Sequence, residues 1–60
     1  MSYFSKGPAV YFGESAASDR WIQENIPGAE PESAPRLDLS REPTEVGDGV
    51  WRYHRAEAED

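Results

Sequence analysis

What limits this chain most is its supply of side chains for a core. Leucine, isoleucine, valine and phenylalanine together make up 9 of the 60 residues, or 15%. A share below about 20%, combined with a high net charge, is typical of chains that stay disordered. Aromatic side chains act in the other direction, because each buries about 150–250 Å² when it packs. Besides phenylalanine, the chain has Tyr3, Tyr11, Trp21, Trp51 and Tyr53.

Sixty residues suffice for a single small domain spanning residues 1–60. A domain of this size without disulfides or a metal is marginally stable alone, because ordering the chain costs on the order of 1–2 kcal/mol per residue. We therefore expect a marginal monomer or a chain completed by a partner, such as a second copy of itself. A largely disordered chain that folds on its partner is the alternative.

The net charge of the chain limits the kinds of molecule that it can bind. Twelve acidic and 6 basic residues give a formal net charge of −6, with Lys6 as the single lysine. Because phosphates repel such a chain, direct nucleic-acid binding is disfavoured. The same composition fits adaptation to high salt (a halophilic protein). We expect added salt to stabilise the fold, since screening weakens the repulsion between like charges.

Several classes of site and location are excluded by what the sequence lacks. There is no cysteine, which removes disulfides, cysteine–zinc sites and thiol catalysis. No segment has the apolar run of a signal peptide or the roughly 20 apolar residues of a membrane span. The sequence therefore predicts a cytoplasmic protein that does not contact a membrane.

The first half of the chain predicts one strand and one helix within residues 8–26, after a flexible lead-in over residues 1–7. The short β-branched and aromatic run Ala9–Phe12 is typical of a strand. A helix is predicted from the capping residue Ser15 to Ile26, where Pro27 ends it. We expect Trp21 to dock this helix on the strand. The predicted apolar stripe of the helix consists of Ala17, Trp21, Ile22 and Ile26.

The second half predicts strands after a proline-rich linker. Residues 27–35 contain three prolines and are expected to be an extended spacer. Within residues 36–55, alternation over residues 36–40 favours a strand, and the Gly47-Asp48-Gly49 turn favours a hairpin between residues 44–46 and 50–55. Residues 56–60 form an acidic tail. Together these elements predict a small α+β unit of order β-α-β-β with a C-terminal β-hairpin.

No segment carries a catalytic or metal-binding motif. Asp38, Ser40 and His54 can be drawn as a triad, but no sequence motif places them together. His54 is the sole strong nitrogen ligand, and no ligand spacing accompanies it. We therefore expect no enzyme activity, no cofactor and no metal.

The last predicted strand has the most distinctive composition. Its residues Trp51 to Arg55 include two aromatics, two arginines and a histidine, and alternation places Trp51, Tyr53 and Arg55 on one face. Either that face is core, or it is a contact surface, since tryptophan, tyrosine and arginine are enriched at protein hot spots. The full set of predicted partner contacts is Tyr11, Phe12, Trp21, Trp51, Arg52, Tyr53 and Arg55.

These features favour a small, acidic, non-catalytic protein-interaction module, either a homo-oligomer or an accessory subunit, that docks through aromatic residues. The alternative is an acidic regulator that mimics nucleic acid and occupies the basic groove of a nucleic-acid-binding enzyme. Its phosphate substitutes would be the carboxylates of Glu30, Glu32, Glu42, Glu45, Glu57, Glu59 and Asp60.

Overall fold

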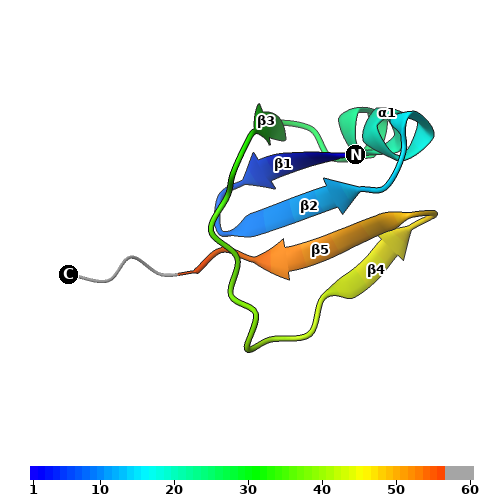
Figure 1. Cartoon of the computed structure of the whole chain (residues 1–60). Helices are drawn as coiled ribbons and strands as arrows, with labels where there is room; N and C mark the ends of the chain where they lie inside the picture. Colours follow the sequence, from blue (N-terminus) through cyan, green and yellow to red (C-terminus); the bar gives the residue numbers. More distant parts are fainter. Residues whose placement is uncertain (57–60) are drawn as a thin grey trace.

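The computed structural model describes residues 1–56 as a small α+β fold, one helix packed on a five-stranded antiparallel sheet (Figure 1). The strands lie in the order β3-β1-β2-β5-β4. The α+β class is thus confirmed, but the predicted β-α-β-β order lacked two strands. The elements are β1 (Ser2–Lys6), β2 (Ala9–Gly13), α1 (Ala16–Asn25), β3 (Glu30–Glu32), β4 (Thr44–Gly47) and β5 (Val50–His54). Of the predicted acidic tail, residues 57–60 lie outside the described residues.

The lead-in predicted for residues 1–7 is wrong, because this segment forms β1. It pairs antiparallel with β2 on one side and with β3 on the other. The β1–β2 hairpin turns at Gly7 and Pro8, where Gly7 has a φ of 59° that glycine adopts without strain. A strand that can hydrogen-bond on both sides is stabilised by its neighbours, a contribution that the local sequence does not reveal.

The helix lies where the sequence predicted it, with Ser15 as its N-cap and Ile26 as its C-cap. The Ser15 side chain accepts a hydrogen bond from the backbone N–H of Ser18 at 3.2 Å. Of the predicted apolar stripe, Ile22 is buried and Trp21 and Ile26 pack against the core, but one position differs. Ala17 is exposed, whereas Ser18 and Ile22 are buried.

Ser18 is buried because α1 docks on the hairpin between β4 and β5. Its hydroxyl donates to the backbone oxygen of Asp48 at 3.1 Å. The ring of Trp21 lies over Gly47 of β4, where a Cβ atom would be only 2.8 Å from the indole. Trp21 was expected to dock on Ala9–Phe12 but reaches to this neighbouring hairpin, because glycine lets the two elements approach closely.

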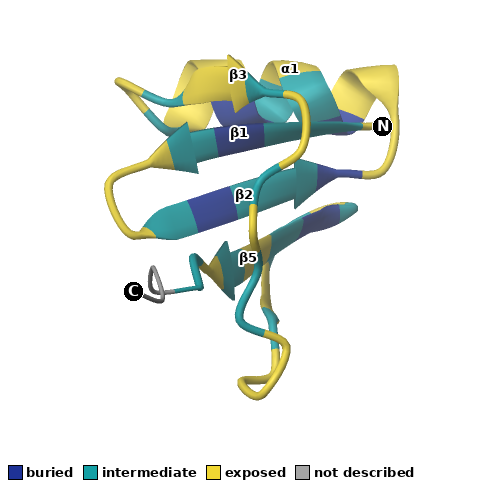
Figure 2. Ribbon diagram, turned by 60° about the vertical axis from the view of Figure 1, so that its left-hand side comes forward, coloured by how far each residue is buried: buried dark blue, intermediate teal, exposed yellow. Residues whose placement is uncertain are grey.

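The core lies between α1 and one face of the sheet (Figure 2). Phe4, Ile22 and Val50 form its buried cluster, with 4%, 0% and 0% of their surfaces exposed. Five partly buried side chains pack around it: Tyr11, Trp21, Ile26, Ala29 and Val46.

The segment between β3 and β4 crosses the sheet on the side opposite α1 (Figure 1). It must cross, because it joins the two outer strands of the sheet. The proline-rich linker predicted for residues 27–35 contains β3, and the strand predicted for residues 36–40 is reduced to one bridge between Leu37 and Arg55. The backbone N–H of Asp38 donates to His54 O at 2.8 Å beside this bridge. Leu39, expected to share a face with Leu37, is 78% exposed.

Candidate interaction surface

On the face of the sheet opposite α1, aromatic side chains stand in one row across three strands. The strand register places Tyr3 of β1 beside Phe12 of β2, and Phe12 beside Trp51 of β5. Directly opposed residues of antiparallel strands share a face and lie within contact distance. The ring centroids of Tyr3 and Phe12 are 5.0 Å apart with an interplanar angle of 42°. Tyr53, two residues along β5, lies on the same side, and we name the four residues the open face.

The open face is only partly covered. Its four aromatic side chains all have intermediate exposure, whereas Val10, beside Tyr53 in the register, is fully buried. The segment between β3 and β4 crosses this side of the sheet (Figure 1). It bridges to Arg55 near the Val10 end and not to the Tyr3–Phe12–Trp51 row. The row therefore keeps apolar surface in water.

A hydrogen bond fixes the indole of Trp51. Its Nε1–H donates to the carboxylate of Glu14 at 2.7 Å. Glu14 follows β2 directly, and its backbone N–H donates to Gly49 O at 3.0 Å, which ties it to the hairpin turn. This hydrogen bond restricts the orientation of the tryptophan ring at the surface of the sheet.

An ion pair spans the same side of the sheet from β3 to the end of β5. The guanidinium of Arg55 donates two hydrogen bonds to the carboxylate of Glu32, at 2.6 and 3.1 Å. This bidentate geometry lowers the pKa of Glu32 below its ordinary value, and a hydrogen bond from Ser5 adds to the effect. The pKa of Arg55 is raised in turn, mainly by its hydrogen bonds to Glu32.

Carboxylates flank the aromatic row. Glu32 of β3 lies beside Tyr3 in the register, and Glu45 of β4 lies beside Trp51 at the other end of the row. Because Glu32 is paired with Arg55, Glu45 and Glu14 supply the free negative charge around the row. A basic partner with apolar side chains would complement such a surface.

The structure separates the predicted contact residues into three groups. Phe12, Trp51 and Tyr53 come together on the open face, while Tyr11 and Trp21 pack against the helix-side core and Arg52 is exposed on that side of the sheet. Arg55 is held by Glu32.

Two residues of this region, Tyr3 and Glu14, were not predicted as contacts, and Glu32 was named only as a phosphate substitute of the alternative function. The two aromatics Tyr3 and Phe4, which favour a strand, shortly before the turn residues Gly7-Pro8 are a hairpin signal that could have placed Tyr3. Nothing local marks Glu14 or Glu32, since their partners lie 37 and 23 residues away.

Asp38, Ser40 and His54 do not form the hydrogen bonds of a catalytic triad. Ser40 donates both its backbone N–H, at 3.1 Å, and its hydroxyl, at 2.5 Å, to Asp38. A nucleophilic serine would instead bond to the histidine. These two hydrogen bonds lower the pKa of Asp38 below its ordinary value, with smaller contributions from Arg41 and His54.

Within residues 1–56, no group of three or more histidine, cysteine, aspartate or glutamate side chains is arranged to hold a metal ion. None of the described helices is long and apolar enough to cross a membrane. No family model matches the chain, and comparisons with curated proteins and with solved structures found no significant match.

Proposed function

We propose that this protein is a non-catalytic protein-interaction module and that its contact surface is the open face. The observation that carries the proposal is the row Tyr3–Phe12–Trp51, which stays partly exposed although the chain has few other side chains for a core. Large aromatic side chains in partial contact with water are the usual anchors of protein interfaces.

The surface is preorganised for a partner. Adjacent strands hold Tyr3 against Phe12, and Glu14 holds the Trp51 indole. The partner is another protein or a second copy of this chain. Self-association brings two chains of charge −6 together, so a foreign partner with basic residues around an apolar centre suits the acidic surroundings of the row better.

The test compares Trp51→Ala with Leu39→Ala. Both changes remove an apolar side chain, but Leu39 lies in the crossing segment and is 78% exposed, away from the row. The two variants and the unaltered chain are immobilised and exposed to extract of the source organism, and bound proteins are identified by mass spectrometry. Sedimentation equilibrium over a range of concentrations measures self-association in parallel.

Trp51→Ala should keep the far-ultraviolet circular dichroism of a folded chain and lose the partner, whereas Leu39→Ala should keep both. High salt should weaken the complex only modestly, because screening reduces the attraction between basic and acidic residues at its edge but does not weaken the burial of apolar surface at its centre. A folded Trp51→Ala chain that retains every partner would refute the proposal. A complex that dissociates sharply as salt rises would instead support the acidic mimic of nucleic acid.

A further inference from the structure

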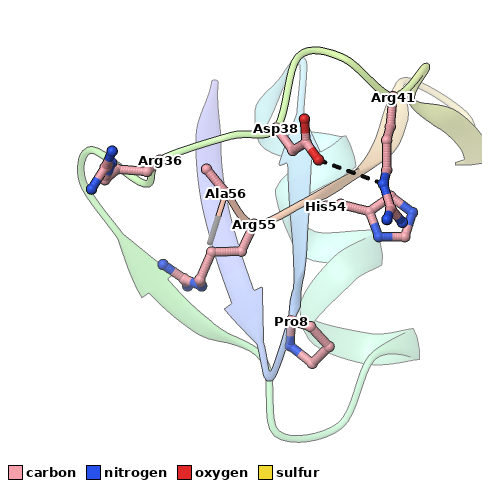
Figure 3. A pocket seen from close by; sticks show the side chains of 7 residues that line it. All are labelled: Pro8, Arg36, Asp38, Arg41, His54, Arg55 and Ala56. Atoms are coloured by element: carbon pink, nitrogen blue, oxygen red, sulfur yellow. Dashed lines mark ion pairs between the residues drawn. The ribbon is translucent and has the colours of Figure 1, made fainter. Parts of the chain in front are cut away.

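Half of the lysine and arginine side chains of this protein line one pocket at the far end of β5. The pocket has a volume of about 550 Å³ and lies between the crossing segment, the β1–β2 turn and residues 54–56 (Figure 3). We name it the arginine pocket. It is lined by Pro8, Arg36, Asp38, Arg41, His54, Arg55 and Ala56.

The charge of the arginine pocket is opposite to that of the whole chain. Three of the 6 lysines and arginines line it, together with the one histidine, against a single aspartate. With Asp38 and with Glu32, which is paired with Arg55, counted against the three arginines, the site keeps one net positive charge on a chain whose total is −6. Acidic proteins stay soluble because their carboxylates are dispersed over the surface. Solubility therefore does not explain why three arginines gather around one pocket.

The arginines differ in how far they are already paired. Arg55 is engaged by Glu32 through both terminal nitrogens. Arg41 meets Asp38 only through Nε, at 3.5 Å, and its side chain is 63% exposed, which leaves its terminal nitrogens for another acceptor. Arg36 has no ion pair within residues 1–56.

The basic side chains lie in two groups around the pocket. Figure 3 shows the Arg41 side chain beside His54 on one side, and Arg36 with Arg55 on the other. A guanidinium group matches phosphate oxygens with two parallel hydrogen bonds, a geometry that lysine cannot provide. A diphosphate carries more negative charge and more acceptor oxygens than a single phosphate, so it can accept hydrogen bonds from more of these donors.

We propose that the arginine pocket binds a phosphate anion and that a diphosphate group binds more tightly than a single phosphate. Arg36 and Arg41 are the residues that carry this site, with His54 as an additional donor. The site shares no residue with the open face, so the proposal is independent of the protein-interaction function.

The test is a titration followed by ¹H–¹⁵N NMR at an ionic strength on the order of 0.01 M, where surface charges are weakly screened. Pyrophosphate, inorganic phosphate and ADP are added to separate samples of the full chain. Pyrophosphate should shift the amide signals of Asp38, Arg55 and Ala56 and bind more tightly than phosphate. ADP that binds at least as tightly as pyrophosphate would assign the site to a nucleotide, and weaker binding of ADP would assign it to the inorganic ion.

Arg36→Gln should weaken pyrophosphate binding by about tenfold, the usual effect of losing one charge-assisted hydrogen bond. Arg41→Gln should act in the same direction. The matched control is Arg20→Gln, which removes the same charge from an exposed position of α1 outside the pocket. Circular dichroism checks that each variant remains folded.

If Arg20→Gln and Arg36→Gln weaken pyrophosphate binding equally, the affinity depends on the net charge of the chain and not on the arginine pocket, and the proposal is overturned. Unchanged affinity in both Arg36→Gln and Arg41→Gln would overturn it as well. Equal affinity for phosphate and pyrophosphate would overturn the preference for two linked phosphates.

Discussion

The two faces of the sheet carry similar side chains but are stabilised in different ways. Beneath α1, Phe4 and Val50 are buried against Ile22 and leave almost no surface in water. On the opposite side, Phe12 of β2 and Trp51 of β5 are neighbours in the register and remain partly exposed. The difference comes from what covers each face, a packed helix on one side and a crossing segment with little regular structure on the other.

On the side of the open face, an ion pair and a hydrogen bond hold side chains that are only partly buried; we call these two contacts polar links. Arg55 joins the end of β5 to Glu32 on β3, and Glu14 holds the indole of Trp51. Such links hold side chains in position without removing them from water, so they contribute little stability each. We therefore expect the buried cluster on the helix side to contribute more to the folding free energy than the partly exposed row Tyr3–Phe12–Trp51 does.

A matched pair of phenylalanines tests this division. Phe4→Ala removes a side chain that is 4% exposed in the helix-side cluster and should cost about 3–5 kcal/mol, the range for a buried aromatic. Because a chain of this size rarely has more than about 3–5 kcal/mol in total, the variant should be largely unfolded. Phe12→Ala should cost less, by about 1 kcal/mol or more, since its ring keeps surface in water.

Urea unfolding followed by circular dichroism measures both variants. The two residues lie on adjacent strands of the same sheet, so strand position is nearly the same for both changes. Equal losses of unfolding free energy would show that the crossing segment covers its side as well as the helix does, and would contradict the division.

A second prediction concerns how closely α1 approaches the sheet. Gly47→Ala places a Cβ atom about 2.8 Å from the Trp21 ring, so the helix must shift or the ring must turn. Overpacking of this kind costs about 1–3 kcal/mol. The measurement is again the urea midpoint, taken for Gly47→Ala, Trp21→Leu and the double variant.

If the contact is direct, the cost of Gly47→Ala should shrink in the Trp21→Leu background, because the smaller side chain leaves room for the methyl group. Strictly additive losses would mean that the glycine is required for some reason other than the helix contact.

Sequence patterns predicted best where the deciding interactions are local. The helix follows from Ser15, which caps it, and from Pro27, which ends it, and both signals act within a few residues. Strand β1 was missed because its stability comes from two neighbouring strands, one of them formed by residues 30–32. The strand predicted for residues 36–40 fails for the opposite reason, since its leucines alternate correctly but only Leu37 reaches β5.

The sequence predicted only part of the candidate surface, because local patterns place residues on a face but do not show what covers that face. Alternation within β5 placed Trp51 and Tyr53 on one face, which the register bears out. Alternation also places Tyr11 and Phe12 on opposite faces of β2, but it could not show that the helix covers the face of Tyr11. The face that a helix covers depends on tertiary contacts, here those of Gly47 and Gly49 with Trp21 and Ser18.

The smallest predicted effect tests the polar link on the open face through its pH dependence. The pKa of Glu32 is lowered in the folded chain, chiefly by hydrogen bonds from Arg55. A carboxylate whose folded pKa lies below its unfolded value stabilises the fold above the unfolded pKa, and this contribution is lost as the pH falls through the folded pKa. Glu32→Gln removes the contribution at every pH. The difference in unfolding free energy between the unaltered chain and Glu32→Gln should therefore be greatest above the ordinary carboxyl value of 4.5 and should shrink towards zero in more acidic solution.

Urea midpoints measured at a series of pH values from neutral to strongly acidic give this difference directly. Glu24→Gln is the control, because it removes the same charge from an exposed position of α1 that makes no ion pair within residues 1–56. General relief of charge repulsion on acidification acts on both variants alike, so only the Glu32 difference should vary with pH in this way. A Glu32 difference that stays constant down to strongly acidic pH would mean that Arg55 does not hold this carboxylate in solution, and the crossing side of the sheet would then depend on its aromatic contacts alone.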